Sequence, residues 1–241
     1  MSRTGEGWPQ AVVDFGRGAR IGLEEAVYCA NKQAAQIEGV LAQHAARRHP
    51  CLLTRLSPQQ LAALGDGWRA QLDYDPVSRT AFFLEGRPLG AVPQVAVVSG
   101  GSSDAAICGE VARTLAFHGV ASTRVEDVGV AGLWRLMDRL DEIRRHPVVI
   151  AVAGMEGALF SVLGGLVGGV VIAVPSSVGY GVAAAGDLSL RSALASCAPG
   201  IVVVNIDNGY GAACAALRVL GLSGASADVA PASIARQSDP Q

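Results

Sequence analysis

Five polar loops carry the side chains with which this chain could do chemistry. They are residues 100–104, 126–129, 154–157, 175–181 and 205–209, and each follows a run of β-branched and aliphatic residues. If those runs are parallel strands, all five loops leave the sheet at its carboxyl edge, where open α/β sheets bind their ligands. Their hydroxyl, amide, carboxylate and aromatic groups could together hold a phosphate, a ribose and a flat ring.

The first loop joins a predicted strand to a predicted helix. Its glycines permit close backbone approach, its hydroxyls can cap the helix, and the free amides of the first turn attract a phosphate or carboxylate. Capping without any ligand is the alternative. The candidate substrate contacts in this loop are Gly101, Ser102, Ser103 and Asp104.

The later loops extend this set of candidate contacts. Asn-Gly and Asp-Asn pairs favour turns anyway, so tight-turn chemistry is the competing explanation for them. The candidate contacts are Asp127, Gly129, Met155, Ser176, Ser177, Tyr180, Gly181, Asn205, Asp207 and Asn208.

Glu156 is the one charged residue between Val148 and Val174, and it lies at a predicted helix N-terminus. The helix dipole favours the carboxylate there, whereas partial burial would oppose its ionisation. A carboxyl in that position could transfer protons or bind a metal-bridged phosphate. A capping glutamate is the alternative.

Cys197 follows Leu190 by seven residues and Leu194 by three, which predicts a place on the buried stripe of a helix over 186–197. Free cysteines are commonly buried, and a helix C-terminus disfavours a thiolate. A reactive role needs a cationic neighbour, which a positively charged substrate could supply.

The positions of other residues argue against a catalytic triad, a dinucleotide-binding fingerprint and a zinc site. All four histidines fall outside the five loops, so neither a Ser-His-Asp nor a Cys-His arrangement can be assembled. The glycine-rich stretch at 164–169 ends a predicted helix instead of opening one, which excludes a dinucleotide fingerprint. No His/Cys cluster has zinc spacing. Lys32 and Arg20 could reach a substrate phosphate or carboxylate, but solvated surface cations are commoner, and neither is assigned.

Composition narrows the class of protein. The 241 residues carry a formal net charge of -2 and no long basic block, which argues against binding nucleic acid. Five cysteines without CxxC spacing, and no secretory signal, indicate a reduced, cytoplasmic protein. The apolar stretch from Val148 to Val174 is rich in glycine and divides into strand, helix and strand, so we predict no membrane segment.

Residues 94–220 alternate strands and helices, which predicts an α/β fold with a three-layer, doubly wound, mainly parallel sheet. The strands are expected near 95–98, 123–125, 148–152, 170–174 and 201–204, and the helices near 104–118, 131–144, 157–167, 186–197 and 211–220. We predict a catalytic domain over 94–221. Residues 1–12 and the tail at 222–241 are Ser/Ala/Gly/Pro-rich and are predicted to be disordered.

A small α/β domain is predicted over residues 13–88. A helix is expected near 34–48, a strand at 51–54, and a helix capped by Ser57 with Pro58 in its first turn. Residues 71–73 and 80–84 can pair as a hairpin. Turn formers at 86–90 place the boundary there.

The segment 99–104 resembles the phosphate-binding signature of the aminoimidazole ribonucleotide (AIR) carboxylase, or PurE, superfamily. The other loop motifs, with Ser196-Cys197-Ala198, resemble the LarB family of carboxylase/hydrolases in nickel-pincer cofactor biosynthesis. The likeness is strong over about 94–215 and weaker at Asp14-Phe15 and at 26–32. It implies a PurE-like, flavodoxin-like sheet.

The resemblance implies a reaction on nicotinic acid adenine dinucleotide with CO2 or bicarbonate. The pyridinium ring is carboxylated and the phosphoanhydride is cleaved, which releases AMP and pyridinium-3,5-biscarboxylate mononucleotide. The matching nucleophile is Cys197, which would add to the ring and later leave. Glu156 is assigned the ring proton as a hypothesis. Mg²⁺ assistance in anhydride cleavage is expected, without assigned ligands, and no tightly bound organic cofactor. A homo-octamer is also implied.

Two other functions compete with this one. A PurE-type imidazole ribonucleotide carboxylase or mutase would not need Cys197. The purine carboxylases carry a Ser-Ala-His-Arg segment after their second strand, however, where this chain has Glu126-Asp127-Val128-Gly129. The third function is a catalytically silent nucleotide-binding module.

Overall fold

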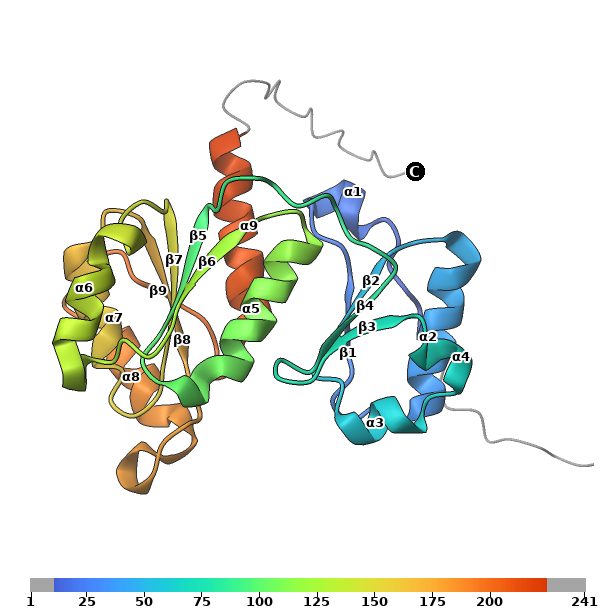
Figure 1. The fold of residues 1–241 in the computed structure, drawn as a ribbon, viewed down its shortest axis with the longest axis horizontal. Helices are drawn as coiled ribbons and strands as arrows, with labels where there is room; N and C mark the ends of the chain where they lie inside the picture. Colours follow the sequence, from blue (N-terminus) through green and yellow to red (C-terminus); the bar gives the residue numbers. More distant parts are fainter. Residues whose placement is uncertain (1–10, 225–241) are drawn as a thin grey trace, which may run out of the picture.

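The computed structural model describes residues 11–224, which form two units, each built on its own sheet (Figure 1). Most of the two terminal stretches predicted to be disordered, 1–10 and 225–241, lies outside the described residues. Residues 222–224 are a correction to that prediction, because they belong to the last helix, α9 (Gly209–Gly224). The sequence from residue 222 onward is rich in serine and alanine, which is why it was predicted to be disordered.

The C-terminal unit contains a five-stranded sheet in the order β6-β5-β7-β8-β9. Its strands are β5 (Val95–Ser99), β6 (Ser122–Val125), β7 (Val148–Ala153), β8 (Val170–Pro175) and β9 (Val202–Val203). Every neighbouring pair is parallel, so all five polar loops do leave the sheet at one edge. The predicted parallel α/β fold is confirmed.

Helices cover both faces of this sheet, as Figure 1 shows. On one face lie α5 (Ala105–Phe117) and α9; on the other lie α6 (Leu133–Ile143), α7 (Ala158–Leu166) and α8 (Asp187–Leu194). Short 3₁₀ turns, η1 (Ser102–Asp104), η2 (Val130–Gly132) and η3 (Gly181–Gly186), precede α5, α6 and α8. Each face encloses its own apolar cluster, which explains why the central strands are apolar at every position.

The long apolar stretch of the sequence is accounted for by β7, α7 and β8. All six residues of β7 are buried, and α7 is only nine residues long. Among the described residues, no helix combines the length and apolarity needed to cross a membrane.

The N-terminal unit has a mixed sheet in the order β1-β2-β4-β3, with strands β1 (Ala26–Tyr28), β2 (Cys51–Thr54), β3 (Leu72–Asp75) and β4 (Thr80–Phe83). The predicted hairpin is the antiparallel pair β3 and β4. Its helices are α1 (Arg17–Ile21), α2 (Ala34–Arg47), α3 (Pro58–Ala63) and α4 (Asp66–Arg69). Ser57 caps α3 by accepting a hydrogen bond from the Gln60 amide, as predicted.

Helix α5 lies between the two sheets and belongs to the packing of both units (Figure 1). Phe117 of α5 packs against Phe82 of β4, with ring centroids 5.4 Å apart. Arg113 covers the same Phe82 ring and donates to Thr80 Oγ1 at 2.7 Å. Gly109 lies so close to Ser78 that an added Cβ would meet the serine Cβ at 2.8 Å. The two units are therefore held in contact along one helix.

Candidate active site

A cavity of about 250 Å³ opens at the carboxyl edge of the parallel sheet; we call it the edge cavity. Four of the five predicted loops contribute residues to its lining. Of the predicted contacts, it is lined by Gly101, Ser103, Asp104, Gly129, Met155 and Glu156. The sequence thus identified the loops that meet here, although they are far apart along the chain.

Two glycines let these loops approach one another. A Cβ on Gly154 would lie 1.9 Å from the carbonyl oxygen of Val178, and one on Gly129 would lie 2.4 Å from that of Gly100. No side chain fits at either distance, so a residue other than glycine would push the loops apart. The walls of the edge cavity are consequently backbone as much as side chain.

Asp104 is the buried charge of the edge cavity, with only 3% of its surface exposed. Its Oδ2 accepts a hydrogen bond from the Gly101 amide at 3.2 Å, whereas its Oδ1 is buried without a hydrogen-bond partner. Burial raises the pKa of this carboxyl above its ordinary value, and hydrogen bonds from Ser176 and Gly101 offset that in part. Asp104 lines the edge cavity, and a buried carboxylate oxygen without a partner can take a hydrogen-bond donor or a cation from a ligand.

Glu156 lies at the rim of the edge cavity and is exposed. The expectation that it is partly buried is therefore wrong for the single chain, because the turn at 154–157 projects beyond the sheet. Met155 and Gly157, on either side of it, have left-handed backbones with φ of 51° and 64°. Such a conformation is costly for methionine, and backbone strain of this kind concentrates at functional sites.

A hydrogen bond joins the loops at 175–181 and 205–209, because Asp207 Oδ1 accepts from the Ser177 amide at 2.7 Å. Within the first of these loops, Ser176 Oγ accepts from the Val178 amide at 3.2 Å. The loop at 175–181 is thereby anchored to the loop at 205–209. Val178 then reaches the lining of the edge cavity.

Other predicted contacts lie outside the lining of the edge cavity. Asn208 caps α9 by accepting from the Gly211 amide, and Asn205 accepts from the adjacent Ile206 amide, so both do turn chemistry here. Tyr180 is 76% exposed. The remaining predicted contacts outside that lining are Ser102, Asp127, Ser176, Ser177, Gly181 and Asp207.

Cys197 does not lie on a buried helical stripe, which corrects the sequence-based expectation. Helix α8 ends at Leu194, which is itself 68% exposed, and Cys197 follows in an irregular segment with an exposed side chain. Ser196, beside it, hydrogen-bonds Ser161 of α7 at 2.7 Å. The thiol is open to solvent but does not line the edge cavity of its own chain.

The other cysteines differ sharply from Cys197. Burial raises the pKa of the Cys29 and Cys108 thiols to about 12, and that of Cys51 still higher. Cys214 is half-buried beside Tyr210, and its pKa is also raised by burial. Cys197 is the exposed one of the five, so it is the thiol that a ligand can reach most readily.

Arg135 is a site residue that sequence reasoning missed. It lines the edge cavity from the first turn of α6 and pairs with Asp127, with Nη1 2.8 Å from Oδ2. The sequence feature that could have identified Arg135 is a cationic residue in the first turn of the helix that follows the second polar loop. Asp127 itself is therefore engaged in an ion pair at the rim and holds Arg135 there.

No resident metal centre is evident in the described part of the chain. Among residues 11–224, no three His, Cys, Asp or Glu side chains are grouped so that they could hold a metal ion. The orphaned Oδ1 of Asp104 is a single carboxylate ligand, and Mg²⁺ is commonly held by one or two carboxylates together with substrate phosphates. The residues present therefore fit a Mg²⁺ ion that enters with a phosphorylated substrate.

Comparison with known proteins places the chain in a family. Residues 94–237 match the family model described as AIR carboxylase. The chain belongs to the AIR carboxylase family. Residues 6–85 match a second model, the LarB/PurE-like N-terminal domain, so this AIR carboxylase relative has the LarB-like domain architecture. The resemblance seen in the sequence motifs is confirmed.

One curated protein and one solved structure are similar to this chain. An uncharacterized protein of Methanocaldococcus jannaschii is 34% identical over 210 residues, which cover 83% of this chain and 80% of that protein. A crystal structure of a PurE2 variant from Treponema denticola matches 54% of this chain and 80% of its own length, with 25% identity and a TM-score of 0.44. Membership of the AIR carboxylase family supports a carboxylase-type function and suggests a carboxylase or mutase enzyme.

Proposed function

We propose that this protein carboxylates the pyridinium ring of nicotinic acid adenine dinucleotide and cleaves its phosphoanhydride. The products would be AMP and pyridinium-3,5-biscarboxylate mononucleotide, the precursor of a nickel-pincer nucleotide. The observation that carries the proposal is the joining of a LarB/PurE-like N-terminal domain to an AIR carboxylase domain in one chain. The exposed thiol of Cys197 supplies the nucleophile that the ring chemistry requires.

A pyridinium ring is electrophilic, so its carbon cannot attack CO2 until a nucleophile has added. The Cys197 thiolate would add to the carbon beside the ring nitrogen, which ends the aromaticity and leaves an enamine. The enamine carbon attacks CO2 and forms a C–C bond. Loss of the proton from that carbon and departure of the thiolate restore the ring, so the net change is CO2 in and one proton out.

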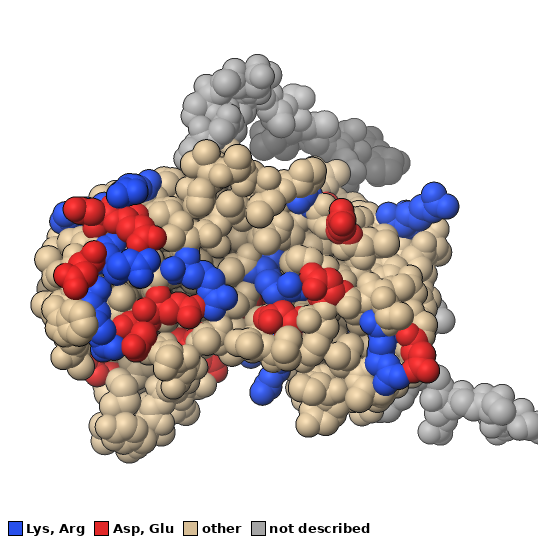
Figure 2. Space-filling model, in the orientation of Figure 1, with Lys and Arg blue, Asp and Glu red and all other residues tan. Residues whose placement is uncertain are grey.

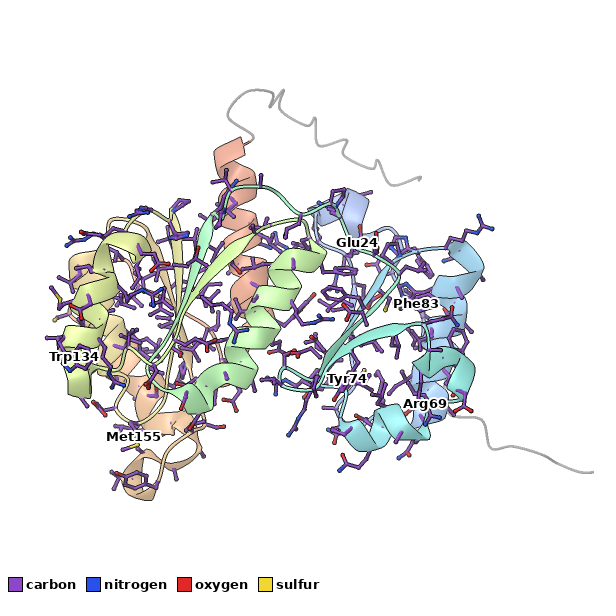
Figure 3. All side chains as sticks on the ribbon, viewed as in Figure 1. Glu24, Arg69, Tyr74, Phe83, Trp134 and Met155 are labelled. Carbon is purple, nitrogen blue, oxygen red and sulfur yellow. The ribbon has the colours of Figure 1, made fainter. Side chains whose placement is uncertain are left out.

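Cys197 and Glu156 do not line one cavity within a single chain, so we propose that a second copy brings them together. The C-terminal unit carries exposed apolar side chains on the elements that follow the polar loops: Val182 of η3 is 93% exposed and Trp134 of α6 is 67% exposed. Trp134 and Met155, labelled in Figure 3, lie on the side of the C-terminal unit away from the N-terminal unit. Exposed apolar groups in such numbers mark interfaces, and closed symmetric assemblies are the usual outcome. An octamer is the assembly we propose.

Glu156 would accept the ring proton, because it is the exposed carboxylate at the rim of the edge cavity. The phosphate nearest the pyridinium ribose would lie at the start of α5, where Gly101 and Ser103 line the cavity. Free backbone amides and the helix dipole both favour an anion there. The ring would then face the turn at 154–157.

In the hydrolysis step, a water oxygen would form a bond to one phosphorus as the bridging P–O bond breaks, and one proton would be released. Mg²⁺ bound to the substrate phosphates would neutralise the charge that develops on the leaving group. Asp104 Oδ1 is the carboxylate oxygen best placed to hold the ion, since it is buried and unpartnered.

A second candidate function is carboxylation or mutation of an imidazole ribonucleotide. It is favoured by the AIR carboxylase match over 94–237 and by the edge cavity of about 250 Å³, which is small for a dinucleotide. That reaction leaves Cys197 without a role. A nucleotide-binding module without catalysis is the third candidate.

One assay separates the three candidates. The purified protein is incubated with nicotinic acid adenine dinucleotide, ¹³C-bicarbonate and Mg²⁺, or with an imidazole ribonucleotide in place of the dinucleotide, and products are analysed by mass spectrometry. AMP with a ¹³C-labelled biscarboxylate mononucleotide is the expected result. Turnover of the imidazole ribonucleotide alone would establish the second candidate, and ligand binding without turnover of either would establish the third.

A further inference from the structure

A second cavity lies between the two units, and we call it the inter-unit cleft. Its volume is about 750 Å³, three times that of the edge cavity. Both units line it: Lys32, Arg55 and Arg79 come from the N-terminal unit, and Ser103, Glu110 and Asp207 from the C-terminal unit. Figure 2 shows basic and acidic side chains together along the junction of the two units.

Two of the three cations in the cleft are not neutralised by an acidic side chain of the described residues. The side chains of Lys32 and Arg79 form no ion pair with any acidic group among the described residues. Arg55 is different, because its Nε lies 3.6 Å from Oε1 of the buried Glu110 and it donates to the Asp207 carbonyl. Arg55 thus offsets the charge of Glu110. Lys32 and Arg79 outnumber the remaining carboxylate, Asp207, so the cleft keeps a net positive charge.

The backbone around the cleft is strained at four non-glycine residues. Asn31, Arg55, Arg79 and Asp207 all have left-handed φ angles, of 65°, 54°, 53° and 57°. These residues come from four separate segments that meet at one cavity. Left-handed backbone at non-glycine residues costs about 1 kcal/mol or more each and clusters at ligand sites. Ion pairing alone does not require this geometry, since Arg113 bridges the units from a regular helix.

The cleft and the edge cavity adjoin each other. Ser103 and Val178 line both, and Ser103 stands just before α5, whose amide groups favour phosphate. The edge cavity alone is below the range of about 300–1,000 Å³ typical of pockets for drug-sized ligands, whereas the two together reach its upper end. A ligand with two nucleotide halves joined by phosphates has this shape.

We propose that the inter-unit cleft binds the adenylate half of the dinucleotide, with its phosphate on Lys32 and Arg79. This inference rests on the proposed function for the identity of the other half. The pyridinium mononucleotide occupies the edge cavity, and the anhydride lies across Ser103. The N-terminal unit therefore selects a dinucleotide over a mononucleotide. Arg55 is a positioning residue, because it ties the N-terminal unit to the loop at 205–209.

The test is calorimetric titration of the full-length protein with AMP and, separately, with nicotinic acid mononucleotide. The variant is Lys32→Gln/Arg79→Gln, which removes the two unpaired charges without burying anything new. AMP affinity should fall at least about tenfold for each charge removed, the scale of one charge-assisted hydrogen bond. Affinity for nicotinic acid mononucleotide should stay within about twofold.

Arg48→Gln is the matched control. Arg48 is also an unpaired, exposed arginine with a left-handed φ, of 49°, but it caps α2 and does not line the cleft. Its AMP affinity should equal that of the unmodified protein. Far-UV circular dichroism and melting temperature confirm that each variant is folded.

The outcomes separate the cleft from the proposed function. AMP binding that is absent in the unmodified protein, or unchanged in the double variant, overturns the cleft assignment, even if the protein carboxylates the dinucleotide. AMP binding that is lost in the double variant supports the cleft, even if no carboxylated product forms and the proposed function fails. If both stand, the double variant should raise KM for the dinucleotide at least about tenfold and change kcat much less.

Discussion

The edge cavity and the inter-unit cleft are built in opposite ways. The edge cavity is formed by loops of one parallel sheet, and glycine backbone makes much of its wall. The cleft is formed by two sheets that pack on a shared helix, and long cationic side chains and strained turns line it. The shape of the edge cavity is therefore set by backbone, whereas the character of the cleft is set by charged side chains. Under the proposed function, the C-terminal unit would carry out the chemistry and the N-terminal unit would contribute binding affinity for the substrate.

The largest expected effect is that of Cys197→Ala, which should abolish carboxylation and leave AMP binding intact. Cys197→Ala should lower carboxylation at least about a thousandfold, because the ring cannot be activated without a nucleophile. The thiol is exposed, so the melting temperature should hardly change. Product formation is measured by mass spectrometry of the labelled mononucleotide, and AMP affinity is measured beside it.

Cys214→Ala is the control for that variant, because Cys214 is half-buried and lines neither the edge cavity nor the inter-unit cleft. Carboxylation should survive in it. Equal carboxylation by Cys197→Ala and the unmodified protein would remove the thiol from the mechanism.

The wall of the edge cavity should be intolerant of a single methyl group at Gly154. Gly154→Ala places a Cβ 1.9 Å from the Val178 carbonyl oxygen, so the turn at 154–157 must separate from the loop at 175–181. The free energy of unfolding should fall by about 2–3 kcal/mol, and activity should fall with it. Urea denaturation measures the former.

Gly165→Ala is the matched control for this substitution. Gly165 lies in α7, and a Cβ built there meets nothing within 4 Å. Alanine should stabilise the helix by about 0.5–1 kcal/mol. A free energy of unfolding for Gly154→Ala that is as high as that of Gly165→Ala would mean that the edge cavity tolerates movement of its walls.

The junction of the two units should depend on pH when Arg55 is removed. Burial raises the folded-state pKa of Glu110 above its ordinary 4.5, so ionisation of this carboxyl costs stability as the pH rises through that raised pKa. Arg55→Ala removes the partner and should cost about 1–3 kcal/mol near pH 8, discounted because Arg55 is 38% exposed. The deficit should shrink below pH 4.5, where the carboxyl is protonated in both states.

Urea denaturation of Arg55→Ala and the unmodified protein at both pH values makes the measurement, and Arg55→Ala/Glu110→Gln should recover much of the loss at the higher pH. A deficit that does not vary with pH would show that packing of Arg55, not the charge on Glu110, holds the junction.

The smallest expected effect concerns Asp104 in the edge cavity. Its pKa is raised by burial, so its charge destabilises the ligand-free protein above the ordinary value of 3.8. Asp104→Asn should therefore raise the free energy of unfolding by about 1 kcal/mol at neutral pH, a gain of roughly 2–4 °C in melting temperature. Below pH 3.8 the gain should disappear.

Asp104→Asn should also weaken the dependence of anhydride cleavage on Mg²⁺ concentration, which titration of the ion at fixed substrate measures. Ser102→Ala, beside it but exposed, is the control and should leave the melting temperature unchanged. A lower melting temperature for Asp104→Asn would show that the carboxylate is stabilised by its surroundings after all.

Most strands and helices of the C-terminal unit could be predicted from the local pattern of apolar and polar residues. Runs such as Val148–Ala153 are buried on both faces, and that burial demands apolar residues at every position. Once the strands are known, parallel pairing places their following loops at one edge, so Asp104 and Glu156 could be assigned to one region before their contacts were known. The hairpin of β3 and β4 was equally local, because its two strands flank a short turn.

The sequence named Cys197 but misplaced it, and it left the cations of the inter-unit cleft unassigned. Cys197 has helical spacing from Leu190 and Leu194, yet α8 ends at Leu194, because Pro199 and the left-handed Gly200 turn the chain toward β9. Lys32 was considered as a phosphate contact but not assigned, and Arg79 was not considered, because a solvated cation and a ligand-binding cation look alike in sequence. Only the meeting of two units around α5 distinguishes them.

The sequence by itself determined the parallel sheet, the edge at which its polar loops emerge, the Ser57 cap of α3 and the family of the protein. These features depend on alternation, burial and turn chemistry within some 30 neighbouring residues, about one strand–helix–strand unit. Tertiary structure alone decided that Asp104 keeps an unpartnered oxygen, that Glu156 and Cys197 stand apart in one chain, and that cations of the N-terminal unit face the start of α5. Burial and ion pairing depend on contacts between segments that are far apart in the sequence, so no local sequence pattern encodes them.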